Sequence, residues 1–215
     1  MKVFIDTADF NIIKDLSKTG LVDGVTTNPS LVAKMGIPFE EVLKEITNII
    51  GGPVSAEVVE SECEKMIESG RNLAKIANNI VVKLPTTLEG LKACQSLTHE
   101  GIQTNITLCF SPTQALMAAK SGATFVSPFM GRIDDMASDS MTLMENISDI
   151  FASYPEYETQ ILAASIRNIN HVVDVAKLGV EAITVPPKIF LQMFNHPLTD
   201  MGIELFNSDW KKAGL

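Results

Sequence analysis

The sequence predicts a (β/α)8 barrel, a fold in which eight parallel strands form a closed ring inside a layer of helices. Short apolar runs alternate with amphipathic stretches along the whole chain. Eight of these runs are strand candidates, spaced roughly 20–37 residues apart, which leaves room for a helix after each. An open doubly wound sheet is the main competing fold, and it usually carries a Gly-rich loop after its first strand. The stretch "IDTADF" has no glycine there, so the barrel is favoured.

The strand candidates are short, apolar and often rich in β-branched residues. In "NIVVKLP", for example, Ile80, Val81 and Val82 indicate a strand that is buried on both faces, as in a parallel sheet. The eight candidates are residues 2–7, 24–28, 53–59, 79–85, 102–108, 124–129, 160–165 and 182–186.

Helical periodicity fills the intervals between the strands, and several of these stretches end in Gly, as helix C-termini often do. The Ser111–Pro112 pair predicts an N-cap followed by proline in the first turn. We find no linker or low-complexity tract, so the expectation is one barrel domain over 1–215 with an extra C-terminal helix at 198–212. The clearest helical stretches are residues 39–50, 61–77, 88–101, 111–122 and 169–179.

Composition limits the classes of partner. The chain has 215 residues, of which 46% are hydrophobic, and a formal charge of -9, which argues against nucleic acid or an anionic membrane as the main partner. Cys63, Cys94 and Cys109 are far apart and do not have a metal-ligand spacing, so free thiols and no metal are expected. The start lacks the apolar core of a signal peptide, and no apolar run is long enough to span a membrane. These features predict a cytoplasmic protein.

Polar residues gather at one end of the strand candidates. Inward positions in a strand recur every two residues, and the carboxyl ends of barrel strands form the face where active sites lie. Seven strands placing polar residues there together is difficult to explain by solvation alone. From strand one to strand seven, the residues at these positions are Asp6, Thr26, Asn28, Ser55, Glu57, Lys83, Asn105, Thr107, Ser127, Phe129, Ser165 and Arg167.

Lys83 has two interpretations. Taken alone, Lys83 is a lysine at a strand end whose side chain extends to the surface. Within a ring of polar residues it is instead a buried amine, and burial favours the neutral form that attacks carbonyls to give a Schiff base. Such chemistry needs a group that moves protons, for which Asp6 and Glu57 are the candidates. The three histidines fall in helices or a loop and are expected to be structural or exposed.

The remaining polar residues indicate a ligand with hydroxyl and phosphate groups. Asn28 and Asn105 are suited to binding hydroxyls, and Arg132 and Arg167 are the only obvious pair of cations for a phosphate. The alternative for both arginines is a surface ion pair, and for Arg132 the neighbouring Asp134 makes that alternative nearly as good.

These residues lie in motifs that resemble the transaldolase family, specifically the short class that also contains the fructose-6-phosphate aldolases. The resemblance runs along essentially the whole chain and is highly specific when the motifs are taken together. The motifs are "FIDTAD", "GVTTNPSL", "VSAEV", "VVKLPTTLEGL", "TNITLCFSPTQA", "FVSPFMGRIDD" and "ILAASIRN".

The resemblance implies a Schiff-base enzyme on a (β/α)8 barrel that uses no metal or organic cofactor. It implies that Lys83 forms the Schiff base and that Asp6 is the acid/base that assists carbon–carbon cleavage. Glu57 and Thr107 would hold a water that relays protons. By the same resemblance, the substrate-binding residues are Asn28, Asn105 and Ser127 for the dihydroxyacetone unit, and Arg132, Ser165 and Arg167 for the phosphate.

Three positions separate the two activities of the family. The aldolase branch typically carries glutamine where this chain has Glu57, tyrosine where it has Phe129 and lysine where it has Arg167. A tyrosine hydroxyl at position 129 would help to protonate the bound enamine, whereas phenylalanine has no proton to donate. All three positions favour a transaldolase, which acts on sugar phosphates in the pentose phosphate pathway.

Two other functions are alternatives. A fructose-6-phosphate aldolase on the same scaffold would release product without an acceptor aldehyde. A non-catalytic sugar-phosphate-binding barrel would keep Arg132 and Arg167 but would need neither Lys83 nor the carboxylates. Short members of the family usually form homo-oligomers, as pentamers or decamers, so the helix at 198–212 either packs on its own barrel or reaches a neighbour.

Overall fold

The strands close into a barrel. The computed structural model describes residues 1–214, and within them the chain forms eight strands and eleven helices. The strands are parallel neighbours in chain order, and β8 pairs with β1 to close the ring. The (β/α)8 prediction is therefore confirmed. The strands are β1 (Lys2–Asp6), β2 (Gly24–Thr26), β3 (Val54–Glu57), β4 (Ile80–Pro85), β5 (Thr104–Cys109), β6 (Phe125–Pro128), β7 (Gln160–Ala163) and β8 (Ala182–Val185).

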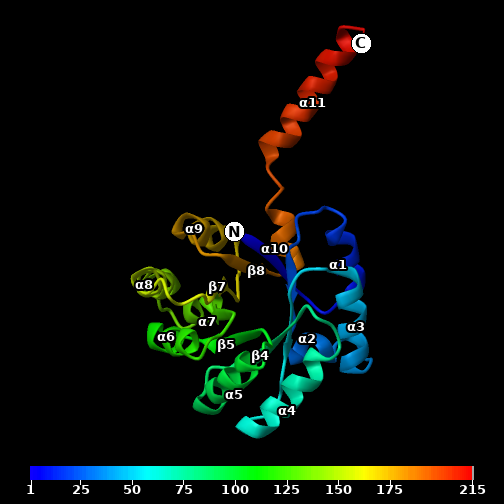
Figure 1. Cartoon of the computed structure of the whole chain (residues 1–215). Helices are drawn as coiled ribbons and strands as arrows, with labels where there is room; N and C mark the ends of the chain where they lie inside the picture. The colour runs from blue at the N-terminus through cyan, green and yellow to red at the C-terminus, as the bar shows by residue number, and fades with distance from the viewer. Residues whose placement is uncertain (215) are drawn as a thin grey trace.

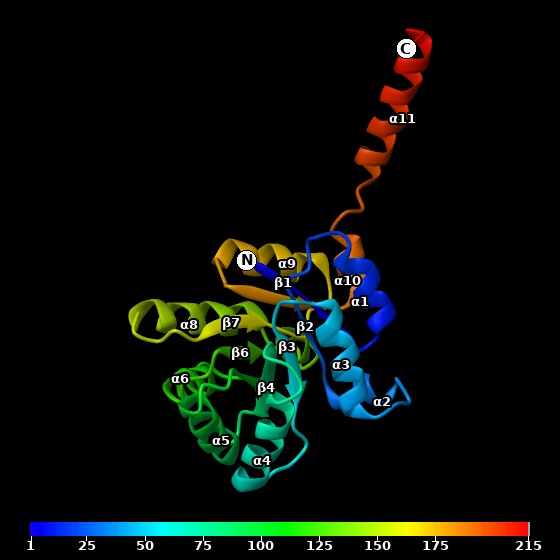
Figure 2. The same ribbon diagram turned by 45° about the vertical axis from the view of Figure 1, so that its right-hand side comes forward.

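The helices surround the barrel, except for the last one, which projects away from it (Figures 1 and 2). Two helices follow each of β2 and β6, where the sequence pattern predicts one, and α11 after α10 is the predicted extra C-terminal helix. The helices are α1 (Phe10–Ser17), α2 (Pro29–Ala33), α3 (Phe39–Ile49), α4 (Cys63–Ala74), α5 (Leu88–His99), α6 (Pro112–Lys120), α7 (Met130–Asp134), α8 (Ser140–Ser153), α9 (Ile169–Leu178), α10 (Pro187–Gln192) and α11 (Pro197–Lys212).

Side-chain caps start many of these helices soon after a strand ends. Asp9 accepts hydrogen bonds from the backbone N–H groups of Asn11 and Ile12 at the start of α1. Ser111 accepts from the N–H of Gln114 and is followed by Pro112, so the predicted cap of α6 is confirmed. Because these caps satisfy backbone donors that the first turn leaves free, the chain turns sharply from strand to helix at the carboxyl end of the barrel.

The interior of the barrel has two layers of side chains, an apolar layer and, closer to the carboxyl ends of the strands, a mostly polar layer. The apolar cluster contains Phe4, Val81, Phe125, Leu162 and Ala182, and the rings of Phe4 and Phe125 meet edge to face at 5.8 Å. Because the strand repeat is two residues, the next inward position on each of these strands lies one layer closer to the carboxyl end. Those positions are Asp6, Lys83, Ser127, Ala164 and Thr184.

Several strands end earlier than predicted, and the predicted strand residues Asn28 and Ser165 lie outside the strands. Asn28 is the N-cap of α2, and its side chain accepts from the N–H of Leu31. Ser165 lies beyond β7 with φ at 59°, and Leu108 has φ at 58° where the β5–β6 register shifts. A positive φ departs from regular strand backbone, so it ends the strand pattern before Ser165 and produces an irregularity within β5 at Leu108.

The C-terminal helix is the least buried element. None of its side chains is buried, and Phe206 and Trp210 are 73% and 61% exposed. It runs from Pro197 to Lys212 and so agrees with the helix predicted at 198–212 to within one residue. Packing on its own barrel is therefore excluded for α11 in this structure. No helix within residues 1–214 combines the length and the apolar character that a membrane crossing requires.

Candidate active site

A cavity of about 460 Å³ opens at the carboxyl end of the barrel. This volume lies within the range of small-molecule sites, and this end of a (β/α)8 barrel is where such sites occur. Every sequence-predicted site residue except Asn105 lines it. The lining residues are Asp6, Thr26, Asn28, Pro29, Ser30, Leu31, Glu57, Lys83, Thr107, Leu108, Ser127, Phe129, Arg132, Ala164, Ser165, Ile166, Arg167, Thr184 and Pro186.

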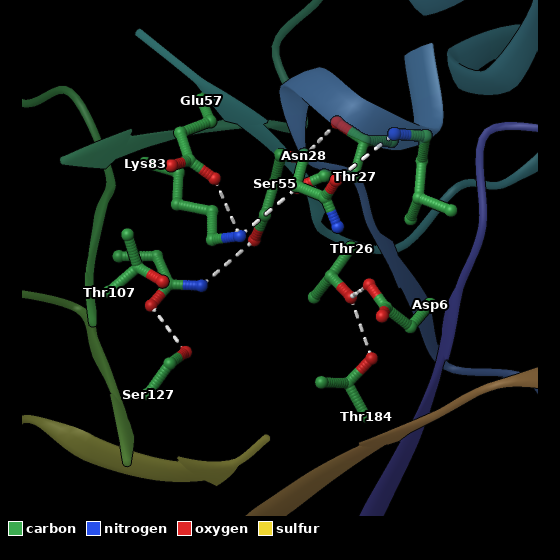
Figure 3. A network of polar contacts seen from close by, with 12 residues as sticks. Asp6, Thr26, Thr27, Asn28, Ser55, Glu57, Lys83, Thr107, Ser127 and Thr184 are labelled. Carbon is green, nitrogen blue, oxygen red and sulfur yellow. Dashed lines mark hydrogen bonds and ion pairs between the residues drawn. The ribbon is translucent and has the colours of Figure 1, made fainter. Parts of the chain in front are cut away.

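Lys83 is held inside the cavity and does not extend to the surface. Its residue is 5% exposed, so the strand-end interpretation is wrong. Its Nζ lies 2.9 Å from Oε2 of Glu57 and donates to the carbonyl oxygen of Thr27 at 3.1 Å (Figure 3). Glu57 and Lys83 are register partners on β3 and β4, so backbone pairing sets their approach. A carboxylate within hydrogen-bond distance is also the nearest acceptor for the proton that an attacking amine must lose.

Asp6 lies on the other side of the cavity in a different environment. Its Oδ1 accepts from the hydroxyl of Thr26 at 2.8 Å, and the Thr26 hydroxyl lies 2.7 Å from that of Thr184 (Figure 3). Burial raises the pKa of the Asp6 carboxyl and outweighs the Thr26 hydrogen bond and the Lys83 charge, which both lower it. The charge of Glu57 adds a smaller upward contribution to that pKa. A carboxyl that takes up and returns a proton near neutral pH benefits from such a shift.

Asn105 lies next to the cavity but does not line it. It is fully buried, its Nδ2 donates to Oγ of Ser55 at 3.1 Å, and its Oδ1 accepts from Ser127 at 2.7 Å. Its amide therefore orients Ser127, which does reach the cavity. The proposed contact of Asn105 with a substrate hydroxyl stays a prediction.

Thr107 presents a hydroxyl without a hydrogen-bond partner among the described residues. The oxygen is buried and belongs to a residue that lines the cavity. Leaving a buried hydroxyl unpaired is costly, so the group is suited to a bound water or a ligand atom. This property fits the water-holding role that the sequence resemblance implied.

The two arginines stand at the outer rim of the cavity and are held differently. Arg167 donates from Nη2 to Oδ2 of Asp135 at 3.0 Å, so the surface ion-pair alternative applies to this residue. The Arg132 guanidinium lies over the ring of Phe129, 5.0 Å from its centroid, rather than against the neighbouring aspartates. Both side chains are exposed, which leaves their remaining N–H donors available to an anion.

Helix α7 is fixed tightly to the segment that carries Ser165 and Arg167. The N–H of Gly131 donates to the carbonyl of Ser165 at 2.9 Å. A Cβ at position 131 would lie 2.3 Å from that oxygen and 2.5 Å from the Arg167 side chain, so only glycine fits. Asp134 contacts Nε2 of His171 at 3.0 Å, which makes His171 structural, as predicted. The separation of the two rim arginines is thus set by backbone packing.

Two hydroxyls of the site were not among the predicted site residues. Thr26 is a polar residue at an inward position of its strand, but its contact with Asp6 depends on the pairing of β1 with β2. Thr184 lies in the last strand candidate, "AITVP", whose other residues are all apolar, so the sequence gives little sign of a polar site residue there. It stands two residues after the interior residue Ala182, so the period-two rule applied to this strand finds it.

The site offers nucleophilic and acid–base groups, and no group of three or more His, Cys, Asp or Glu side chains within residues 1–214 is arranged to hold a metal ion. The buried amine beside a carboxylate can form a Schiff base with a substrate carbonyl. The second carboxyl, with its raised pKa, can exchange protons, and the two rim guanidiniums can bind an anionic group of the substrate.

A family model and two named relatives show which known proteins this chain resembles. The family described as Transaldolase/Fructose-6-phosphate aldolase matches residues 3–214. A protein of Parvibaculum lavamentivorans named "Probable transaldolase" is 57% identical over 214 residues, covering 100% of this chain and 98% of that protein. A protein of Rhizobium meliloti with the same name is 56% identical, with the same coverage. The chain therefore belongs to the transaldolase/fructose-6-phosphate aldolase family.

Proposed function

We propose that this protein is a transaldolase that moves a dihydroxyacetone unit from a ketose phosphate to an aldose phosphate through a Schiff base on Lys83. The observation that carries this proposal is the placement of the Lys83 amine, buried inside the cavity and 2.9 Å from the Glu57 carboxylate. The names of the relatives and the family match support the same activity.

The proposed reaction begins with attack of the Lys83 amine on the ketose carbonyl, C2. Loss of water leaves an iminium, which accepts electrons from the breaking C3–C4 bond. Asp6 takes the proton of the C4 hydroxyl as that bond breaks, and an aldose phosphate leaves. The enamine that remains on Lys83 attacks the carbonyl of an acceptor aldehyde, and Asp6 returns its proton to the new hydroxyl. A water hydrolyses the Schiff base and restores the amine.

Water and proton transfer at the lysine are assigned to Glu57 and Thr107. Glu57 contacts the amine directly, and the unpaired Thr107 hydroxyl provides the second partner that an ordered water needs. The Oδ1 of Asn28 caps α2, so its Nδ2 is the group that we assign to a substrate hydroxyl. Ser127 is assigned a second hydroxyl, with Asn105 fixing its orientation.

The phosphate is assigned to the rim formed by Arg132, Ser165 and Arg167. For Arg167 this requires that the phosphate replace Asp135 as the partner of the guanidinium. The replacement is feasible because the ion pair is exposed and therefore weak. The expected substrates are sedoheptulose 7-phosphate with glyceraldehyde 3-phosphate, giving erythrose 4-phosphate and fructose 6-phosphate. That reaction belongs to the non-oxidative pentose phosphate pathway, and we assign the enzyme to the cytoplasm.

The acceptor dependence of the reaction tests this function. Fructose 6-phosphate is supplied with and without erythrose 4-phosphate, and glyceraldehyde 3-phosphate is measured through a coupled enzyme. We expect rapid release only when the acceptor is present. Equally rapid release without acceptor would identify a fructose-6-phosphate aldolase, and binding of fructose 6-phosphate with no turnover in either arm would identify a binding protein.

We also propose that the protein is a homo-oligomer in which α11 contacts a neighbouring subunit. A helix with no buried side chain and with Phe206 and Trp210 largely exposed lacks the apolar contacts that normally stabilise a helix. By resemblance to short members of the family, the expected assembly is a pentamer or decamer.

The oligomer is tested by analytical ultracentrifugation of the full chain and of the double variant Phe206→Glu, Trp210→Glu. We expect a multiple of the single-chain mass for the first and a smaller species for the second. A single-chain mass for the unmodified protein would rule out this part of the proposal.

A further inference from the structure

When Asp6 is ionised, the contacts among Asp6, Thr26 and Thr184 allow only one placement of the two hydroxyl hydrogens. The Thr26 hydroxyl has one hydrogen, and an ionised Asp6 can only accept, so Thr26 donates to it at 2.8 Å. The 2.7 Å contact between Thr26 and Thr184 then needs a donor, and only Thr184 can supply the hydrogen. The three groups therefore form a chain in which each hydroxyl donates toward the carboxylate.

The contact between the two threonines spans a strand. Thr26 is on β2 and Thr184 is on β8, and β1, which carries Asp6, lies between them in the barrel. Both threonines are almost fully buried, at 2% and 4% exposure, and both line the cavity. Two buried hydroxyls that meet over the strand bearing the acid restrict where Asp6 and Thr26 can rotate.

The site contains few other groups that act on Asp6. The ionisable groups that act on it are Lys83 and Glu57 from across the cavity. From the adjoining strands β2 and β8, the neighbours are the uncharged hydroxyls of Thr26 and Thr184. A carboxylate made less stable by burial depends on the donors that remain, so a second hydroxyl that aligns the first has a measurable effect.

We propose that Thr184 is a positioning residue, which donates to Thr26 and thereby orients the hydroxyl that holds Asp6 in its ionised form. This inference rests on the proposed function, because it assumes that Asp6 accepts a proton during turnover. Thr184 itself need not contact the reacting atoms.

The test separates the hydroxyl of Thr184 from its shape. Thr184→Val keeps the shape and removes the hydroxyl, whereas Thr184→Ser keeps the hydroxyl and removes a methyl group. For Thr184→Val we expect kcat to fall about threefold to fivefold, the factor for one ordinary hydrogen bond, with KM nearly unchanged. We also expect the acid limb of its pH–rate profile to move to higher pH, and Thr184→Ser to keep that limb at the wild-type position.

The opposite pattern overturns the proposal. An acid limb that stays in place in Thr184→Val, with activity lost in Thr184→Ser, would assign Thr184 to packing alone. Thr159→Val is the matched control, because the Thr159 hydroxyl is also buried and donates to the carbonyl of Ala123 at 2.6 Å, outside the cavity lining. We expect it to lower thermal stability without moving the pH profile.

A cycle of variants tests whether Thr184 acts through Thr26. If it does, the double variant Thr26→Val, Thr184→Val has the same acid limb as Thr26→Val alone. Additive movement of the limb would show that Thr184 acts on Asp6 by another route and would contradict the proposed chain.

A measurement without substrate keeps this inference separate from the proposed function. Carbon-13 NMR titration of the Asp6 carboxyl, assigned with Asp6→Asn, should give a higher apparent pKa in Thr184→Val than in the wild type. An unchanged titration overturns the inference even if the enzyme is a transaldolase. A moved titration upholds it even if no transfer activity is found. If Thr184→Val does not fold, Thr184→Ala removes the same hydroxyl and is titrated in its place.

Discussion

The two sides of the cavity treat a carboxylate in opposite ways. On the lysine side, formed by Glu57 and Lys83, Oε2 of the carboxyl group lies 2.9 Å from the side-chain nitrogen of Lys83. On the aspartate side, formed by Asp6, Thr26 and Thr184, the carboxylate meets hydroxyls, and burial raises its pKa. Of the two carboxyls, Asp6 is the one whose burial favours the protonated form, and a raised pKa suits a group that exchanges a proton. The difference supports the roles proposed above, with Glu57 as the partner of the amine and Asp6 as the group that cycles its proton.

Removing the amine should have the largest effect on the lysine side. We expect Lys83→Met to lower kcat by at least about 10⁴, because no other group can form the covalent intermediate. Borohydride reduction in the presence of fructose 6-phosphate should label the wild type and leave the variant unlabelled. Lys92→Met is the control, since Lys92 is an exposed lysine paired with Glu89 on α5, and its labelling should equal that of the wild type. An active Lys83→Met would exclude the Schiff-base mechanism.

Removing the charge on the aspartate side should block a later step. We expect Asp6→Asn to lower kcat by about 10² to 10⁴, the usual contribution of a general acid–base group. Borohydride labelling of Lys83 should persist, because the amine and Glu57 are intact. In the wild type, transfer should decline as the pH falls through the Asp6 pKa, and that limb should lie above the range of an exposed aspartate because burial raises this pKa. Loss of labelling in Asp6→Asn would remove the distinction between the two sides.

Stability should change in opposite directions on the two sides. An acid with a raised pKa in the folded state binds its proton better there, so stability falls as pH rises from the unfolded to the folded pKa and stays lower above it. Asp6→Asn should therefore increase the free energy of unfolding at neutral pH. Glu57→Gln leaves a buried ammonium without its anion and should decrease it by about 2 kcal/mol. Urea unfolding measures both, and a change of the same sign in both would contradict this contrast.

The smallest change concerns the fate of the enamine between the two sides. The Phe129 ring lines the cavity and packs edge to face against Phe110, with centroids 5.7 Å apart. Tyrosine at this position adds a proton donor, so we expect Phe129→Tyr to raise acceptor-independent release of glyceraldehyde 3-phosphate severalfold. Phe110→Tyr is the control for a hydroxyl added to the neighbouring ring, outside the cavity lining, and should leave release unchanged. No increase in Phe129→Tyr would count against the role of the missing hydroxyl.

The lysine side was more accessible to sequence reasoning than the aspartate side. Lys83 is a charged residue in the apolar run "IVVKLP", and a charged residue in a buried strand is unusual enough to indicate a functional site. Thr184 in "AITVP" does not, because threonine is common in strands and is neutral there. The phosphate rim was predicted as a pair of arginines, but the link of Arg167 to Asp135 depends on how α7 packs against the segment after β7.

The pattern of residues along the chain is enough to predict the eight strands, the barrel and the end at which the polar side chains gather, since a period of two along each strand places them there. Which of these side chains touch depends on how the barrel closes. Closing the barrel brings β8 beside β1, so that Thr184 meets Thr26 across 158 positions of sequence. Only the tertiary structure decided that α11 leaves its own barrel. Contacts between distant strands depend on register and curvature, and a local pattern encodes neither.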